Sequence, residues 1–244
     1  MERKIALITG SSRGIGRAIA CRLATDGYHV LVHCAGNRVK AEEVQQLIVE
    51  NGGSAEVMQA DLCDLSQTAA LAQMVKNVDV LVLNASVQFR NGWQSIPVEE
   101  CQLQLNCNFT SSLMLIQAVA DHMKQKHWGR IVTIGSVQEA KPHPDMLIYS
   151  ASKAAQTNMV QSLSLQLASY GITVNNVAPG VIYTDRNIEV LADEVYAKKV
   201  TDSIPVRFYG EPEDLAGIVS LLCSDEGRYI TGQNIFVDGG KSVQ

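Results

Sequence analysis

Residues 4–16 read KIALITGSSRGIG, and this stretch decides the fold. The apolar run at 4–8 has the length and composition of a buried strand. After the glycines, apolar residues recur with helical spacing at Ile19, Ala20 and Leu23. The sequence therefore predicts a strand, a glycine-rich turn and a helix in immediate succession.

The glycine-rich turn is a candidate phosphate-binding site. Glycine lets the backbone turn sharply and approach a ligand, and a helix start offers free N–H groups and the positive end of its dipole. The spacing differs from the usual G-x-G-x-x-G fingerprint, and a glycine turn alone is more often only a tight loop. Its place at the first strand-to-helix junction favours binding of a dinucleotide pyrophosphate. The residues expected to make this contact are Gly10, Ser12, Arg13, Gly14, Ile15 and Gly16.

Strand-like and helical runs alternate along the rest of the chain, as in a parallel sheet covered on both faces. No Pro/Gly/Ser-rich linker divides the 244 residues. We therefore expect one α/β domain over 1–244, a Rossmann fold with a seven-stranded parallel sheet and helices on both faces. The expected strands are 4–9, 29–34, 55–60, 79–83, 130–135, 173–177 and 234–237. The stretch 186–205 is charged and amphipathic and reads as an insertion.

Composition excludes several classes of function. The chain is 46% hydrophobic and 18% charged, enough for a large core, and its net charge of −5 gives no support to nucleic-acid or anionic membrane binding. The six cysteines lack C-x-x-C spacing and read as reduced core residues, and the five histidines are scattered, so no metal site is expected. No apolar run approaches the ~18 residues of a membrane span, and no signal-peptide hydrophobic region follows Met1. We expect a cytoplasmic protein.

Tyr149 and Lys153 lie one helical turn apart in the segment YSASK. A fixed ammonium favours an ionised phenol: lowering a tyrosine pKa from near 10 by ~3 units requires about 4 kcal/mol, roughly what a unit charge supplies at ~4 Å and an effective dielectric near 20. Taken alone, such a pair is usually a plain helix-surface contact. Ser136 lies upstream, directly after the apolar run at 131–134.

Together these motifs resemble the short-chain dehydrogenase/reductase family, and its 3-oxoacyl-acyl-carrier-protein reductase-like members in particular. The resemblance runs from residue 4 to about residue 240. Further segments that carry it are Asp61-Leu62, Asn84-Ala85-Ser86, Asn108, Pro179-Gly180-Val181-Ile182-Tyr183-Thr184, Gly210-Glu211-Pro212-Glu213-Asp214 and Val237-Asp238-Gly239-Gly240.

The resemblance implies a catalytic set. Tyr149 would be the general acid in reduction and the general base in oxidation, and Ser136 would position the substrate oxygen. Lys153 would hold the nicotinamide ribose and lower the tyrosine pKa. Asn108 would anchor a water that leads protons from Lys153 to solvent, although Asn106 is a rival and a solvated polar face is the alternative for either. The insertion at 186–205 would close over the substrate.

Cofactor choice depends on the end of the second expected strand. NAD enzymes usually place a carboxylate there, and this chain has none between His33 and Arg38. Arg13, Asn37 and Arg38 suit the 2′-phosphate of NADP(H), unless Arg38 only starts a solvated helix and Arg13 only covers the adenine. Asp61 is expected to bond the adenine amino group, or else to cap a helix. The remaining residues expected to contact the cofactor are His33, Leu62, Asn84, Ala85, Ser86, Tyr149, Lys153, Pro179, Gly180, Ile182 and Thr184.

Two departures from the family pattern bear on function. Ser86 stands where the family usually has glycine beside the nicotinamide ribose, so its side chain could shift the cofactor or narrow the pocket. Relatives that act on acyl-carrier protein present basic residues at the ends of two long helices, whereas this chain has His127-Trp128 and Ser169-Tyr170-Gly171 there, with Lys124 and Lys126 nearby. The carrier-protein role is therefore weakened.

The leading hypothesis is an NADP(H)-dependent carbonyl reductase or alcohol dehydrogenase, with substrates running from 3-oxoacyl thioesters to sugars, polyols and small ketones. The alternatives are a 3-oxoacyl-acyl-carrier-protein reductase of fatty-acid synthesis and a catalytically silent dinucleotide sensor. The family also implies a homotetramer packed through the helices carrying Asn108 and Tyr149. Apolar positions consistent with this, which could equally face their own core, are Leu113, Ile116, Leu163 and Leu167.

Overall fold

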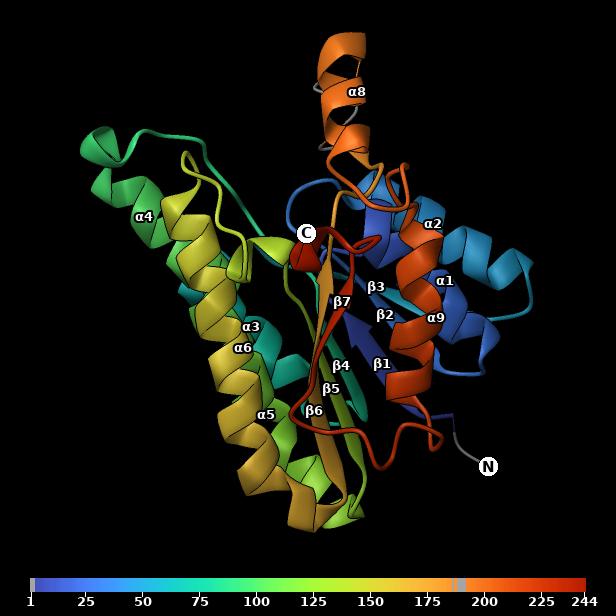
Figure 1. Ribbon diagram of the computed structural model, residues 1–244. Helices are drawn as coiled ribbons and strands as arrows, with labels where there is room; N and C mark the ends of the chain where they lie inside the picture. The colour runs from blue at the N-terminus through green and yellow to red at the C-terminus, as the bar shows by residue number, and fades with distance from the viewer. Residues whose placement is uncertain (1–2, 186, 188–191) are drawn as a thin grey trace.

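A parallel sheet of seven strands forms the centre of the protein (Figure 1). The computed structural model describes residues 3–185, 187 and 192–244. The strands are β1 (Ile5–Ile8), β2 (His29–Cys34), β3 (Ser54–Gln59), β4 (Val80–Leu83), β5 (Gly129–Ile134), β6 (Ile172–Pro179) and β7 (Asn234–Val237). Their spatial order is β3-β2-β1-β4-β5-β6-β7, with every neighbouring pair parallel. The expected fold class is confirmed.

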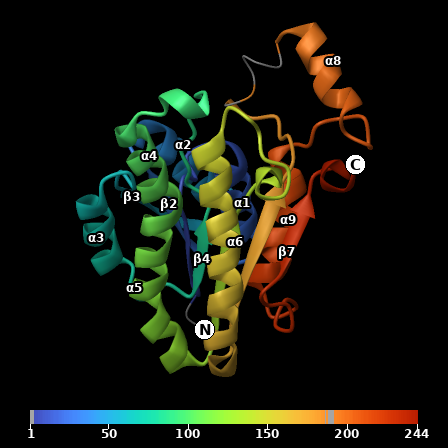
Figure 2. The ribbon, with the colours of Figure 1, turned by 60° about the vertical axis from the view of Figure 1, so that its left-hand side comes forward.

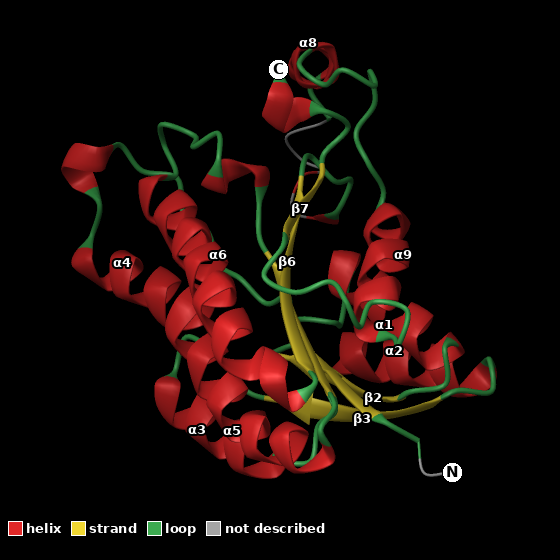
Figure 3. Cartoon of the chain, turned by 60° about the horizontal axis from the view of Figure 1, so that its bottom comes forward, coloured by secondary structure: helices red, strands yellow, loops and turns green. Residues whose placement is uncertain are grey.

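Helices cover both faces of the sheet (Figures 2 and 3). One face carries α1 (Gly14–Thr25), α2 (Arg38–Glu50) and α9 (Pro212–Cys223). The other carries α3 (Leu65–Met74), α4 (Val98–Leu105), α5 (Ser111–Lys126) and α6 (Leu147–Leu167). Helix α8 (Glu194–Asp202) stands above the carboxyl end of the sheet in Figure 1. It belongs to the insertion expected at 186–205, of which residues 186 and 188–191 lie outside the described residues.

The side chains of the strands pack into two separate hydrophobic cores. Ala6 and Ile8 pack into the cluster under α1 and α9, whereas Leu7 packs into the cluster under α3, α5 and α6. Successive side chains on a strand point to opposite faces, so a sheet buried on both sides needs continuous apolar runs. This is why central strands such as β1 and β4 are continuous apolar segments, and the strands lie within a residue or two of their expected bounds. Strand β6 is longer than expected, because its pairing with β7 continues to Pro179.

The strand order predicts where on the sheet a ligand binds. Strand β1 lies between β2 and β4, so the chain winds outward in opposite directions on its two sides. In such sheets ligands bind beyond the carboxyl ends of the strands at this switch point. Here the carboxyl ends of β1 and β4 lead into the glycine turn and into Asn84.

The long helical segment around Asn108 departs from a regular helix. Helix α4 passes through a π-helical turn, Asn106–Thr110, into α5. Such one-turn insertions are rare in helices, and those that occur are frequently at functional sites. Short 3-10 turns also occur at Trp93–Ser95, Val137–Glu139, Ala168–Tyr170 and Lys241–Val243.

The four apolar positions considered for subunit packing face the core of their own chain. Ile116 and Leu167 are buried, and Leu113 and Leu163 are partly buried against the same cluster. This is the alternative left open by the sequence. These residues therefore lend no support to a tetramer.

Across the described ranges, the structure has no helix both long and apolar enough to span a membrane.

Candidate functional site

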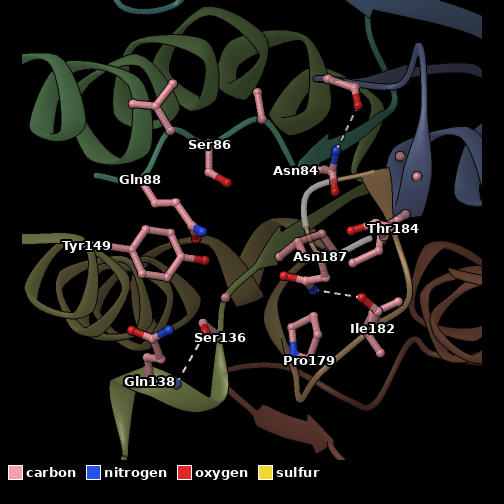
Figure 4. A pocket seen from close by; sticks show the side chains of 18 of the residues that line it. Asn84, Ser86, Gln88, Ser136, Gln138, Tyr149, Pro179, Ile182, Thr184 and Asn187 are labelled. Carbon is pink, nitrogen blue, oxygen red and sulfur yellow. Dashed lines mark hydrogen bonds between the residues drawn. The ribbon is translucent and has the colours of Figure 1, made fainter. Parts of the chain in front are cut away.

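A cavity of ≈ 650 Å³ opens at the carboxyl ends of the central strands (Figure 4). Of the residues expected to contact the cofactor, all line it except Asn37, Arg38 and Lys153. Ser136 and Tyr149 line it as well, while Lys153 and Asn108 lie behind its wall, almost fully buried. The structure thus gathers in one place motifs that lie far apart in the sequence.

The glycine turn has the shape of a phosphate cradle. Gly10 has φ +65°, which side chains rarely allow, and a Cβ on Gly16 would lie 2.4 Å from the carbonyl oxygen of Gly10. Helix α1 begins at Gly14 with no side chain capping it and no acidic residue in its first turn. A helix start of this kind attracts an anion. The turn therefore fits a pyrophosphate.

Asn84, which follows β4, and Thr9, which follows β1, hold the glycine turn in place. The Asn84 amide nitrogen donates to the carbonyl oxygens of Thr9 (2.9 Å) and Gly10 (3.0 Å). The Thr9 hydroxyl accepts from the backbone N–H groups of Asn84 (2.9 Å) and Ala85 (3.0 Å). These bonds fix the cradle relative to the strand that carries Ser86.

His33 supports the turn from β2. Its Nδ1 accepts from the Gly10 N–H at 3.0 Å, so a neutral ring carries its proton on Nε2. Burial lowers the pKa of His33 to about 4, against a smaller opposing effect from the Ala60 carbonyl. Nε2 has no hydrogen-bond partner among the described residues although it is buried. A donor left in this state at a cavity wall suits a polar ligand.

The residues expected to bind the adenosine part of the cofactor, here called the adenosine corner, are Arg13, Asn37, Arg38 and Asp61. Their side-chain contacts differ in part from expectation. Arg13 Nη1 lies 3.5 Å from Asp185 Oδ2, and Lys40 Nζ lies 3.7 Å from the same oxygen. Arg38 instead pairs with Glu42 at 2.8 Å along α2, and the Asn37 side chain accepts from the Lys40 N–H, capping that helix. Asn37 and Arg38 are therefore engaged in the helix start, the alternative that sequence analysis left open for Arg38. Lys40 is a nearby cation that it missed.

Asp61 does not cap the following helix. That role belongs to Asp64, whose carboxylate accepts from the Ser66 N–H at 2.8 Å. Asp61 Oδ1 accepts from the Cys63 N–H at 2.9 Å and the residue lines the cavity. Its place on the cavity wall suits an acceptor for an adenine amino group.

Ser136 and Tyr149 face the same part of the cavity, bordered by Ser86 and Gln88 (Figure 4). Ser136 follows β5 after Gly135, and its hydroxyl accepts from the Gln138 N–H at 3.2 Å. Tyr149 lies in the first turn of α6, with Lys153 one turn later. Lys153 Nζ lies 5.8 Å from the centre of the Tyr149 ring. The arrangement can present a phenol and a hydroxyl to one substrate oxygen.

Lys153 is held by a chain of buried polar groups. Its ammonium donates to the Ile134 carbonyl oxygen (2.8 Å) and to Gln156 Oε1 (2.9 Å). Gln156 Nε2 donates to Ser112 Oγ at 3.1 Å, and Ser112 Oγ donates to the Asn108 carbonyl oxygen at 3.3 Å. Sequence analysis missed Gln156. The available signal was a polar side chain on a helix face whose neighbours pack into the core.

Asn108, rather than its rival Asn106, packs against α6. Its side chain exchanges two hydrogen bonds with the Val87 backbone and donates to Ser152 Oγ at 3.0 Å. Asn106 points elsewhere, donating to the Cys63 carbonyl oxygen. The Asn108 side chain thus joins the segment after β4 to the residue preceding Lys153.

The end of β6 completes the cavity through Pro179, Gly180, Ile182 and Thr184. Asn187 Nδ2 donates to the Ile182 carbonyl oxygen at 2.8 Å, tying the start of the insertion to this wall (Figure 4). Nowhere in the described ranges do three or more His, Cys, Asp or Glu side chains form a group that could hold a metal ion.

Comparison with known proteins identifies the family. The short chain dehydrogenase model matches residues 4–195. The 3-oxoacyl-[acyl-carrier-protein] reductase FabG of Staphylococcus aureus is 38% identical over 241 residues, 97% of each chain.

Two solved structures are similar along nearly the whole chain. A 3-oxoacyl (acyl-carrier-protein) reductase from Agrobacterium tumefaciens with NADP bound is 34% identical, with a TM-score of 0.92 and coverage of 97% of this chain and 93% of that one. A gluconate 5-dehydrogenase from Burkholderia cenocepacia in complex with NADP and tartrate is 29% identical, with a TM-score of 0.92 and coverage of 100% and 97%. With its glycine cradle, sheet topology and these matches, the chain belongs to the short-chain dehydrogenase family.

Proposed function

We propose that the protein is an NADP(H)-dependent oxidoreductase acting on a carbonyl or alcohol group. The observation that carries the proposal is the cavity itself, where Ser136 and Tyr149 open onto the same space as the glycine cradle. The bound nicotinamide would supply or accept a hydride. Both structural relatives described above contain NADP.

The residues of this chain would divide the proton chemistry. Tyr149 donates a proton to the substrate oxygen in reduction and removes it in oxidation, while Ser136 holds that oxygen. The buried Lys153 ammonium would favour the ionised phenol, and by family resemblance Lys153 would also hold the nicotinamide ribose. Asn108 would anchor a water on the path from Lys153 to solvent.

NADP(H) is favoured over NAD(H) by charge at the adenosine corner. No carboxylate stands at the end of β2, Arg13 belongs to the glycine turn, and Lys40 lies with Arg13 beside Asp185. Asp185 bonds both cations, so a 2′-phosphate would compete with it for them. The relatives with NADP bound support the same choice.

A 3-oxoacyl-acyl-carrier-protein reductase is the second candidate, favoured by the 38% identical relative of that name. The helix ends argue against it. Lys126 Nζ is 2.8 Å from the buried carboxylate of Asp79, and Lys124 lies over the Tyr170 ring. Neither lysine is fully available to an acidic partner. Comparing a 3-oxoacyl group on carrier protein with the same group on a small thiol separates the candidates.

A catalytically silent sensor is disfavoured because such proteins usually lose the tyrosine or lysine, and both are present here.

We also propose a cytoplasmic protein, supported by six thiols that form no disulfides. We propose a homotetramer by family resemblance. A monomer at micromolar concentration in light scattering would refute the tetramer.

The test is a panel of ketones, sugars, polyols and 3-oxoacyl thioesters, followed by nicotinamide absorbance. We expect NADPH consumption with at least one carbonyl. Ser136→Ala should lower the rate and spare cofactor affinity, whereas Lys153→Ala should lower both, because Lys153 is proposed to hold the ribose as well as to favour the ionised phenol. A protein that binds NADPH and consumes it with no carbonyl would be a sensor.

A further inference from the structure

Charge is divided unequally along the cavity. Among the described lining residues the only carboxylates are Asp61 and Asp185, both at the nucleotide end, where Asp185 already pairs with Arg13 and Lys40. The rest of the lining carries three cationic side chains and one histidine: Arg90, Lys141, Lys241 and His143. This part of the cavity is therefore positive.

Backbone hydrogen bonds bring the cationic segments to the catalytic residues. The Lys141 N–H donates to the Val137 carbonyl oxygen at 2.9 Å, in the turn directly after Ser136. The Asn91 N–H donates to the Asp145 carbonyl oxygen at 2.9 Å, which ties the segment carrying Arg90 to the one carrying Lys141 and His143. The backbone segments that carry Arg90 and Lys141 are thus held near Ser136.

The positive groups have few internal partners. Arg90 makes no hydrogen bond or ion pair with a described residue. Lys241 Nζ donates to the neutral hydroxyl of Ser203 at 2.7 Å, and Lys141 donates to an oxygen of Gln244, the last residue of the sequence. Asp238 is the acidic group near Lys241, and its oxygens accept from the N–H groups of Gly240 and Ser242.

The two lysines repel one another. Burial, and next the charge of Lys141, lower the pKa of Lys241, while Asp238 opposes them with a smaller effect. Two ammonium groups that line the same cavity are stabilised when an anion lies between them.

We propose that Arg90, Lys141 and Lys241 form a subsite for the carboxylate of the substrate, so that the substrate class is an oxo acid or the corresponding hydroxy acid. The inference rests on the proposed function. In this arrangement the carboxylate lies at the cations, and the carbonyl oxygen reaches Ser136 and Tyr149. The subsite orients the substrate without touching the reacting carbon.

Matched substrates test the charge alone. A series of oxo acids is compared with the corresponding primary amides, with NADPH saturating. We expect kcat/KM at least about tenfold higher for the best acid than for its amide, and a tenfold loss of that preference in Lys141→Met/Lys241→Met. Lys76→Met, an exposed lysine outside the cavity, is the control and should alter neither rate. Phosphate esters of hydroxy ketones form a further arm, and a preference for them over every oxo acid would overturn the carboxylate assignment.

A binding measurement separates this inference from the proposed function. Tartrate is titrated calorimetrically into the protein saturated with NADP⁺. We expect binding that is lost in Lys141→Met/Lys241→Met and kept in Lys76→Met. The inference is overturned if the protein turns over neutral carbonyls with no preference for acids, or if tartrate binds equally well to Lys141→Met/Lys241→Met. Neither result would contradict the proposed oxidoreductase activity. Lysine-dependent tartrate binding without any turnover would support the subsite and overturn the proposed function.

Discussion

Gln156 holds the ammonium of Lys153: its Oε1 accepts from Lys153 Nζ at 2.9 Å, and both side chains are almost completely buried. A buried charge is costly unless polar groups surround it. Gln156 provides one such group and is itself fixed by its bond to Ser112. The position of the lysine that is proposed to favour the ionised tyrosine therefore depends on a neutral neighbour one helical turn away.

Replacing Gln156 by leucine should weaken catalysis. Gln156→Leu removes an acceptor from Lys153 and leaves Ser112 without its donor, so kcat/KM should fall by about tenfold or more, from the ~1–3 kcal/mol that such a loss costs. Gln161→Leu, on the exposed side of the same helix, is the control. Equal kinetics in the two variants would show that Gln156 has no part in positioning Lys153.

Replacing Gln156 by glutamate should shift the pH profile. A carboxylate beside the ammonium reduces the positive field at the phenol and so raises the pKa of Tyr149 relative to the unmodified protein. Alcohol oxidation needs the ionised phenol, so the rise in its rate should move to higher pH in Gln156→Glu. The measurement is kcat/KM for oxidation against pH. A shift to lower pH would contradict this account.

The adenosine corner should discriminate between cofactors. We expect NADPH to bind at least about tenfold tighter than NADH, a difference of ~1.4 kcal/mol. Arg13→Ala should remove more of this preference than Arg38→Ala, because Arg38 pairs with Glu42, and the double variant should remove most of it. Fluorescence titration measures both affinities, with Arg22→Ala as the control. Equal affinities in the unmodified protein would refute the assignment.

Asp79 should stabilise the fold through buried bonds. Its carboxylate accepts from the Ile5 N–H, Lys126 and His122. Burial alone would raise its pKa, but the hydrogen bonds outweigh this and lower it. Because the folded pKa lies below the unfolded value near 3.9, the stabilisation is present above about pH 4 and is lost as pH falls through the folded pKa.

Asp79→Asn should therefore lower the free energy of unfolding by about 2 kcal/mol at neutral pH. The difference from the unmodified protein should shrink below about pH 4 in urea unfolding. Asp121→Asn, at an exposed position on α5, should change stability by less than ~0.5 kcal/mol. A loss for Asp79→Asn that stays constant down to pH 3 would indicate that the charge is not its source.

Local spacing explains what the sequence could predict. The glycine cradle and the Tyr149–Lys153 pair depend on residues close in the chain, so their geometry follows from one turn or one helix. The cap at Asn37 and the Arg38–Glu42 pair were also readable from local chemistry, since asparagine caps helices and charges four apart pair.

The remaining features depend on contacts between distant segments. Lys40 meets Asp185, Lys241 lies near Lys141, and Gln156 reaches Ser112 only after the sheet has formed. The π-helical turn at Asn106–Thr110 also left no pattern of apolar spacing. No local propensity encodes these contacts, so sequence alone could not place them.

The phenol of Tyr149 is the centre of the proposed chemistry, and Tyr149→Phe tests it most directly. The change removes one oxygen at a cavity wall, so folding and NADPH affinity should stay nearly unchanged. Turnover of a carbonyl that the unmodified protein reduces should fall by at least the ~100-fold typical of losing a general acid. Full activity in the Tyr149→Phe protein, with NADPH bound normally, would contradict the assignment of Tyr149 and Lys153 as the catalytic pair.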